Sequence, residues 1–297
     1  MSTKTIDPKD LSQRECYHIL SAAVAPRPIC FASTINQTGE VNLSPYSFFN
    51  VFSSNPPIMV FSPNRSGKNN STKDTHDNVL EVPEVCINIV NYAIVEQMSL
   101  SSTAYAKGVD EFVKSGLTPV PSDKIKPPRV GEAPVAFECK VNQVIALGDG
   151  PGAGNLVIAE VVRIHIQEKY LDEQGKLPTE KLDLVARMGG SYYTRAVPEA
   201  LFEIPKPNRD IGIGVDQLPE AVRNSTVLTG NNLGRLGNLK ELPTTEAVAA
   251  IAQHKEVQKL ATIASREERR QGTHQLAQVW LEQGQIEAAL CLLVWAD

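Results

Sequence analysis

Short apolar runs rich in valine, isoleucine and phenylalanine dominate the first two thirds of the chain. The segments PICFASTI, SFFNVF, PIMVFSP and EVCINIVN alternate with polar segments such as NQTGE, SSNPP and PNRSGKNN. Two longer runs follow, AFECKVNQVIALG and NLVIAEVVRIHIQ, joined by DGPGAG. Apolar runs bounded by Gly, Pro, Asn and Ser clusters predict β-strands. Because the strands are many and short, with few long helices between them, the pattern favours a barrel over a doubly wound sheet.

Helical patterns are expected before, within and after this strand-rich part. Residues 8–23 predict a short helix, and residues 93–105 predict a further helical piece. Residues 244–295 predict helices, because the TTE sequence at their start resembles a capped N-terminus and apolar residues then recur at three- and four-residue spacing. A break at 283–285 separates the last two helices, which we expect to pack as an antiparallel pair.

The length of 297 residues allows one core domain with an appendage. We expect a mainly β fold with helices, in which residues 1–205 form the barrel domain. Residues 206–297 are expected to form a linker with one short helix, followed by a C-terminal α-helical extension.

Composition and charge narrow the classes of partner. The net charge is -5, so the long basic surface that duplex nucleic acid or an anionic membrane would attract is not expected. The N-terminus is polar and lacks the apolar core of a signal peptide. No apolar run approaches the roughly 18 residues of a membrane-spanning helix. We therefore expect a cytoplasmic protein that binds neither nucleic acid nor membranes.

Several chemistries find no motif in the chain. The five cysteines are scattered and form no CxxC pair, so we expect reduced, buried thiols. The five histidines show no metal-ligand spacing, and no metal site is expected. The chain has no GxSxG or Walker A sequence, and no catalytic residue is assigned. The glycine-rich segment 148–154 lies between two strands and predicts a hairpin loop, because no helix follows that could hold a pyrophosphate.

Residues 27–75 combine features of a phosphate site with those of an apolar slot. Arg65, Lys68 and Lys73 fall in this segment of an otherwise acidic chain, and the KDT sequence precedes a helical stretch whose free amides could face an anion. The PYSFF sequence adds aromatic bulk. Small hydroxyl residues recur there as Ser33, Thr34, Ser44, Ser47, Ser62, Ser66 and Thr75. Each residue alone is more typical of a strand end or a solvated loop, and only their concentration points towards a flat ring with a phosphate tail.

The same segment resembles a known family. The stretch APRPICFASTINQTGEVNLSPYSFFNVFSSNPPIMVFSPN, followed by KDTHDN, is similar to the flavin reductase-like family with the FMN-binding split-barrel fold. This family includes flavoredoxin and the reductase components of two-component monooxygenases. The segments MSLSSTAYAKGVDEFVKSGLTPVPS, APVAFECKV and ARMGGSYYTR follow in the same order as in the family. The resemblance covers about residues 10–200, and it implies an FMN site at a homodimer interface.

Carried over by position, the resemblance implies contacts to the flavin ring and its ribityl chain. Thr34 and Ser47 would make these contacts, together with backbone groups of residues 44–49. Tyr193 would close the site, from the second subunit or from the far edge of the barrel. Phe31 departs from the family, in which tryptophan is frequent at this position, and this should alter ring packing more than binding.

The resemblance also implies how the phosphate is held. Ser62 and Arg65 would continue along the chain of the cofactor, Lys73 and Thr75 would hold its phosphate, and Asp74 would orient the loop. The complete set of implied cofactor-binding residues is Thr34, Asn42, Ser44, Pro45, Tyr46, Ser47, Phe48, Phe49, Ser62, Arg65, Lys73, Asp74, Thr75 and Tyr193.

Three functions are compatible with this resemblance. The first is a flavin reductase that transfers hydride from NAD(P)H to N5 of FMN, in which the protein supplies orientation and electrostatics rather than a dedicated acid or base. Backbone N–H groups near the ring would then stabilise the charge of the reduced flavin. The second is a flavoredoxin-like electron carrier that does not react with nicotinamide. The third is a scaffold or sensor whose tail, residues 244–297, binds partners.

Overall fold

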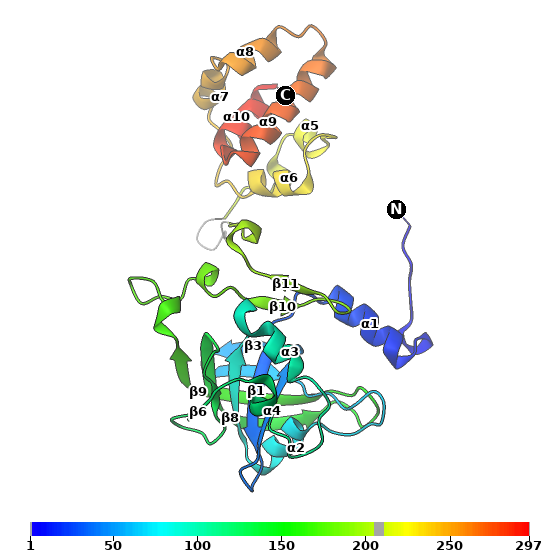
Figure 1. Ribbon diagram of the computed structural model, residues 1–297. Coiled ribbons are helices and arrows are strands. Elements are labelled where there is room, and N and C mark those ends of the chain that lie inside the picture. The colour runs from blue at the N-terminus through cyan, green and yellow to red at the C-terminus, as the bar shows by residue number, and fades with distance from the viewer. Residues whose placement is uncertain (1, 205–210, 297) are drawn as a thin grey trace. The chain divides into compact units, whose positions relative to one another are not determined.

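The computed structural model describes residues 2–204 and 211–296 (Figure 1). The chain divides into two compact units, unit 1 with residues 1–202 and unit 2 with residues 203–297. Unit 1 is built on a β-sheet and unit 2 is helical, which confirms the expected mainly β fold with a helical C-terminal part. The expected linker begins in residues 205–210, which lie outside the described part of the chain.

Unit 1 is organised by a seven-stranded antiparallel sheet in the order β2-β1-β5-β8-β9-β4-β3. Strands β2 and β3 lie at opposite ends of this order, yet only Ser47 and Phe48 connect them. The two ends of the sheet must therefore meet, so the sheet curls into a barrel with one seam that is not hydrogen-bonded. We call this seam at Ser47 and Phe48 the split. The strands are β1 (Cys30–Ile35), β2 (Val41–Tyr46), β3 (Phe49–Ser54), β4 (Pro57–Phe61), β5 (Glu84–Ile89), β8 (Val135–Ala146) and β9 (Asn155–Ile166).

Strands β8 and β9 form a long antiparallel hairpin in the middle of the sheet order. Its pairing shifts register twice, between Glu138 and Cys139 and between Val141 and Gln143. Such bulges add twist and help a sheet to curl. The glycine-rich segment 148–154 is the loop of this hairpin, as the sequence predicted. Two small antiparallel ribbons complete the β-structure, β6 (Pro119–Val120) with β7 (Arg129–Val130), and β10 (Val185–Arg187) with β11 (Tyr193–Arg195).

The apolar residues of β1 explain why the sheet is covered on both faces. Cys30 and Ala32 point into the barrel core, where they pack with Phe61. Phe31, between them, points to the opposite face and packs with Met98 and other residues of the covering helices. Side chains alternate along a strand, so a continuously apolar run such as this one requires two cores.

Short helices cover the sheet, and two of them are shorter than expected. The predicted helix at 8–23 is interrupted, because Ser12 starts a new helix with a reciprocal capping box to Glu15, an arrangement that stabilises a helix by about 1 kcal/mol. The predicted helix at 93–105 ends at Leu100. The helices of unit 1 are α1 (Gln13–Ala23), α2 (Asp74–Glu81), α3 (Val95–Leu100) and α4 (Glu111–Ser115), with 3-10 turns η1 (Pro8–Asp10), η2 (Tyr92–Ile94), η3 (Glu168–Tyr170), η4 (Thr179–Lys181) and η5 (Pro198–Ala200).

The cysteines are free thiols, as expected from their spacing. Cys30, Cys86, Cys139 and Cys291 are buried, whereas Cys16 is only half-buried on α1, against the expectation of burial for all five. Burial raises the pKa of the Cys30 and Cys86 thiols well above the usual value. These thiols therefore stay protonated at neutral pH and serve as small apolar core residues.

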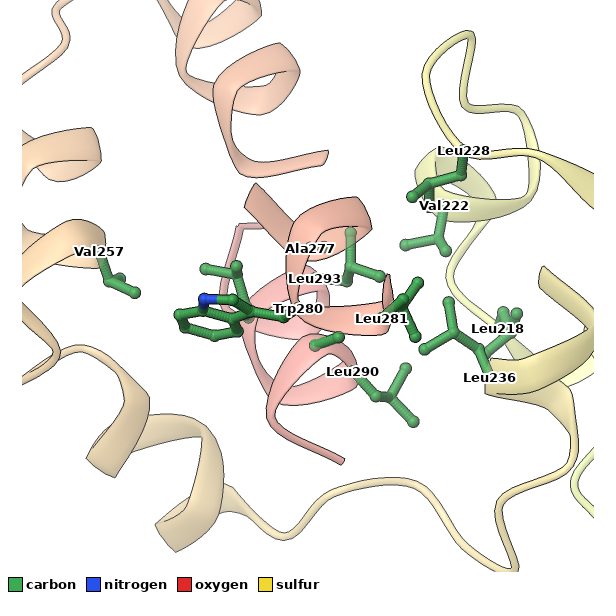
Figure 2. Packing of buried hydrophobic residues seen from close by; sticks show 12 residues of the cluster. Leu218, Val222, Leu228, Leu236, Val257, Ala277, Trp280, Leu281, Leu290 and Leu293 are labelled. Atoms are coloured by element: carbon green, nitrogen blue, oxygen red, sulfur yellow. The ribbon is translucent and has the colours of Figure 1, made fainter. Parts of the chain in front are cut away.

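Unit 2 is a helical unit with its own core (Figure 2). Trp280 and Leu281 of α9 lie at the centre of this core, with Val257 of α8 on one side and Leu218 and Leu236 on the other. The one short helix expected within residues 206–225 corresponds to α5, whereas α6 was not expected, and both helices contribute to the core. The helices are α5 (Glu220–Arg223), α6 (Gly230–Gly237), α7 (Thr245–Ile251), α8 (Lys255–Ala261), α9 (Arg266–Glu282) and α10 (Ile286–Ala296), preceded by η6 (Val215–Gln217).

Two local predictions for unit 2 hold. Thr244 caps α7, and its hydroxyl oxygen accepts a hydrogen bond from the Ala247 N–H at 3.2 Å. Helices α9 and α10 pack against each other across the short turn at 283–285, where Gly284 adopts φ +77°. Such a left-handed residue is the usual end of a helix, and glycine adopts it without strain. Within the described residues, no helix has the length and apolar character needed to cross a bilayer.

Candidate functional site

An apolar groove opens on one side of the split. It has a volume of about 410 Å³ and is walled mainly by aromatic and aliphatic side chains. Phe52 on the edge strand β3 is 68% exposed beside it. Gly154 lets its backbone lie close to two other lining residues, because a Cβ there would lie 2.9 Å from Ser62 Oγ and 3.2 Å from Leu147. The lining residues are Phe48, Phe49, Asn50, Phe52, Val60, Phe61, Ser62, Asn64, Leu147, Gly154 and Leu156.

The loop after β4, residues 62–73, borders this groove and is rigidly braced. The Arg65 guanidinium donates from Nε to Asn70 Oδ1 at 2.8 Å and from Nη2 to the Asn70 carbonyl at 2.7 Å. The Arg65 amide donates to the Ala153 carbonyl at 2.8 Å, which ties the loop to the β8–β9 hairpin. The Ser62 hydroxyl accepts from the Asn155 N–H at 3.0 Å and donates to Asn64 Oδ1 at 2.7 Å. Arg65 and Ser62 therefore first of all shape the loop.

The same loop ends at the N-terminus of α2 with exposed cations. Lys73 is the exposed N-cap residue of α2, and no side chain caps the free amides there. Asp74 is the first residue of the helix. Among the described residues, neither Lys68 nor Lys73 forms an ion pair. Free amides at a helix start next to unpaired cations suit an anion such as a phosphate.

Thr75 lies deeper than a direct phosphate ligand would. Its side chain is fully buried, and its oxygen accepts hydrogen bonds from Asn42 Nδ2 at 2.7 Å and from the Tyr46 hydroxyl at 2.8 Å. Burial raises the pKa of Tyr46 to about 12, so this hydroxyl remains a donor at neutral pH. Thr34 is also fully buried, and its hydroxyl accepts from Asn78 Nδ2 at 3.1 Å. Together these groups form a buried polar layer that joins β1, β2 and α2.

A second, smaller cavity lies on the other side of the split. It has a volume of about 150 Å³. The Arg187 guanidinium lies 4.7 Å from the ring centroid of Tyr193, which is 38% exposed. Ser47 lines this cavity, whereas its neighbour Phe48 lines the apolar groove, so the two cavities flank the connection between β2 and β3. The lining residues are Ile29, Pro45, Tyr46, Ser47, Met98, Ser102, Arg187 and Tyr193.

The expected cofactor residues thus fall into four places. Phe48, Phe49 and Ser62 line the apolar groove. Pro45, Tyr46, Ser47 and Tyr193 line the second cavity. Arg65, Lys73 and Asp74 belong to the bordering loop and the start of α2. Thr34, Asn42 and Thr75 belong to the buried polar layer, and Ser44 lies on β2 opposite Ala32.

In the second cavity, sequence reasoning missed two residues with polar side chains. Arg187 lies within ARMGGSYYTR, a segment that carried the family resemblance, but no role was assigned to it. Ser102 lies just after α3. The sequence signal for Arg187 was its position close to Tyr193, the tyrosine expected to close the site. Nothing in the local pattern around Ser102 distinguishes it from other loop serines.

The donor set suits a flavin. The groove offers apolar walls for a flat ring, and the adjoining loop offers cations and amides for a phosphate tail. No nucleophile with an adjacent base lines either cavity among the described residues, so the arrangement fits binding and orientation of a redox cofactor.

Comparison with known proteins agrees with this geometry. The family model described as "Flavin reductase like domain" matches residues 22–185. The uncharacterized protein YwrF of Bacillus subtilis is 34% identical over 201 residues, which are 67% of this chain and 96% of that protein. The match thus spans nearly the whole of that relative, and unit 2 lies outside the family model.

Solved structures share the fold of unit 1. Nitrilotriacetate monooxygenase component B from Bacillus cereus superposes with a TM-score of 0.64 at 29% identity, covering 69% of this chain and 100% of that one. The 2-nitrobenzoate 2-nitroreductase NbaA of Pseudomonas fluorescens gives a TM-score of 0.61 at 27% identity, covering 68% and 97%. The family match over more than half of the chain, the split barrel and the flavin-compatible groove agree, and the chain belongs to the flavin reductase-like family of flavin-binding oxidoreductases.

Proposed function

We propose that the chain binds FMN at the split and reduces it with NAD(P)H. The observation that carries this proposal is the apolar groove beside Phe48, which opens next to a loop with two unpaired cations, Lys68 and Lys73, among the described residues. A tricyclic ring with a phosphate tail requires this combination of apolar walls and a cationic rim.

Each part of the site has a defined task in this proposal. Phe48 and Phe49 would contact the ring, while Lys73 and the free amides at the start of α2 would bind the phosphate. Arg65 would keep the loop in shape through Asn70. The buried layer around Thr75 would act from beneath by fixing α2 against β2.

In this reaction the cofactor would carry the electrons, and the chain would bind and orient it. When bound, FMN accepts a hydride at N5 from a nicotinamide and passes the electrons on. The aromatic walls of the groove would exclude water from the ring. Tyr46 keeps its proton at neutral pH, because burial raises its pKa to about 12, so it would hold Thr75 rather than supply a proton.

A homodimer would complete the site. Val51 and Phe52 lie on the edge strand β3 and are 57% and 68% exposed, directly beside the groove. Exposed apolar residues on an edge strand typically mark a contact surface. A second copy of the chain on this strand would cover them and shield the groove. Light scattering should therefore give a dimer mass for the wild type and a monomer mass for Phe52→Asp.

Anaerobic mixing tests the proposed function. The purified chain is reconstituted with FMN, freed of excess cofactor and mixed with NADH or NADPH while the visible flavin band is followed. We expect bleaching with at least one of the two donors. Bound flavin that is bleached by dithionite but by neither nicotinamide would contradict the reductase and favour an electron carrier. Failure of the chain to bind FMN at all would overturn the cofactor assignment and leave the scaffold interpretation.

A further inference from the structure

Arg187 is held in place at the rim of the second cavity. It ends β10, where it pairs with Tyr193 of β11. Its backbone amide donates to the Arg27 carbonyl at 2.8 Å, and its carbonyl accepts from the Arg27 amide at 3.0 Å. Beside it, a Cβ on Gly189 would come within 3.0 Å of Ala22 in α1. Because both the strand and the following turn are held in place, the backbone at Arg187 has a fixed position.

The guanidinium of Arg187 keeps its charge unpaired. Nη2 donates to the Gly190 carbonyl at 2.7 Å, and the group stacks on the Tyr193 ring. None of the described acidic side chains pairs with it. Arg195 on the same ribbon differs, since it binds Asp183 at 2.6 and 2.8 Å. One of the two arginines is therefore neutralised, and the other faces a cavity with its charge available.

The second cavity offers no other formal charge and little space. Its lining holds Arg187 and otherwise only apolar, hydroxyl or phenol side chains. Nearby Arg27 donates from Nη1 to the Val24 carbonyl, just after α1, at 2.6 Å and from Nη2 to the Met188 carbonyl at 3.0 Å, so it acts as a brace. A volume of about 150 Å³ admits the edge of a ring but not a phosphate-bearing nucleotide. The cavity adjoins Ser47, one of the residues expected at the flavin ring.

We propose that Arg187, positioned by Tyr193, stabilises the negative charge that the flavin ring gains on reduction. The proposal rests on the proposed function. Transfer of one hydride from a nicotinamide adds two electrons and one proton to the ring, so the ring gains one negative charge, which spreads over its pyrimidine edge. A preorganised cation beside the ring stabilises such a charge without reorganisation. Arg187 would thus bind reduced flavin more tightly than oxidised flavin and raise the reduction potential.

The test measures the reduction potential of bound FMN in the wild type, Arg187→Gln, Arg187→Lys and Arg195→Gln. Spectroelectrochemistry with a reference dye gives the potential, and separate titrations give the affinity for oxidised FMN. For Arg187→Gln we expect the binding ratio of reduced to oxidised flavin to fall at least tenfold. This corresponds to a potential lower by about 30 mV for a two-electron couple. Arg187→Lys should retain part of the effect, and Arg195→Gln, from the same ribbon, should behave as the wild type.

The outcomes separate this inference from the proposed function. If Arg187→Gln binds oxidised FMN as the wild type does and its potential equals that of Arg195→Gln, Arg187 does not tune the flavin. Equal loss of affinity for oxidised and reduced FMN would also overturn the inference, because the arginine would then only bind the ring. A changed KM for the nicotinamide with an unchanged potential would assign Arg187 to the donor instead and refute the proposal. A wild type that binds no FMN refutes the proposed function itself.

Discussion

The Tyr46 hydroxyl donates a hydrogen bond of 2.8 Å to Thr75 Oγ1, which joins β2 to the first turn of α2. Asn42 donates to the same oxygen at 2.7 Å. One buried hydroxyl thus satisfies two donors and ties the strand that leads to the split to the helix that follows the loop at 62–73.

Removing the acceptor at this point should destabilise unit 1. Thr75→Val removes the acceptor that the Tyr46 hydroxyl and the Asn42 amide share, and a lost buried hydrogen-bond partner costs about 1–3 kcal/mol. We expect the free energy of unfolding to fall by about 2–4 kcal/mol, measured by urea unfolding followed by far-UV circular dichroism. Thr75→Ser, which keeps the acceptor, should stay close to the wild type. Equal stability of Thr75→Val and the wild type would show that the layer is not structural.

Alkaline pH should destabilise unit 1 over a defined range. Burial raises the pKa of Cys139 from 9.0 to about 12 and that of Tyr46 from 10.0 to about 12. The unfolded chain releases these protons at lower pH than the folded chain. The contribution of the two protonated groups to the free energy of unfolding is therefore complete below pH 9 and is lost between pH 9 and pH 12. The melting temperature should fall across this range. The melting temperature of Tyr46→Phe should fall less steeply above pH 10 than that of the wild type. Parallel pH profiles of the two proteins would contradict the assignment to Tyr46.

Acid should weaken the contact that holds the loop at 121–127. Burial by itself would raise the pKa of Glu138, but hydrogen bonds from the Asp123 amide at 2.7 Å, from His165 at 2.6 Å and from the Lys124 amide at 2.6 Å hold it below 4.5. Stability from Glu138 is thus present above pH 4.5 and lost as the pH falls below it. The melting temperature of Glu138→Gln should therefore change less between pH 5 and pH 3 than that of the wild type. The exposed control Glu180→Gln should follow the wild type, and a Glu138→Gln profile equal to that of this control would contradict the assignment.

Lys73 should contribute directly to FMN binding. Lys73→Ala removes the exposed cation at the start of α2, and a hydrogen bond to a charged group is worth about 1.5–3 kcal/mol. We expect the dissociation constant for FMN, measured by quenching of flavin fluorescence, to rise about tenfold to a hundredfold. Lys4→Ala, which removes an exposed cation far from the loop in sequence, serves as the matched control. An FMN affinity equal to that of Lys4→Ala would remove Lys73 from the phosphate site.

The two units should unfold separately when unit 2 is weakened. Trp280 is almost fully buried in the core of unit 2, and truncating such a side chain costs about 3–5 kcal/mol. Both tryptophans of the chain, Trp280 and Trp295, belong to unit 2, so the remaining indole of Trp280→Ala reports on that unit alone. We expect Trp280→Ala to unfold at lower urea while its FMN affinity stays at the wild-type value. Trp280→Phe should lose less stability, and a loss of FMN binding in Trp280→Ala would show that the units depend on each other.

Local sequence signals predicted the elements whose cause is local. The apolar runs around β1, β4, β5, β8 and β9 marked strands, the glycine-rich segment 148–154 marked a hairpin loop, and Thr244 marked a helix start. Each of these depends on side-chain alternation or on a backbone hydrogen bond within a few residues. Several motifs in order, from the stretch at residues 25–64 to ARMGGSYYTR, also indicated the family to which the chain belongs.

Tertiary structure alone decided how these elements form a site. The split exists because β2 and β3, joined by two residues, end up at opposite ends of the sheet order, and this depends on pairings between strands far apart in sequence. The same closure placed Thr75 in a buried layer rather than on the cavity wall and brought Arg187 next to Ser47. The sequence by itself determined the strands, the turns and the family. Which side chains face the cavities was decided by barrel closure, because contacts between distant strands leave no periodic trace in the chain.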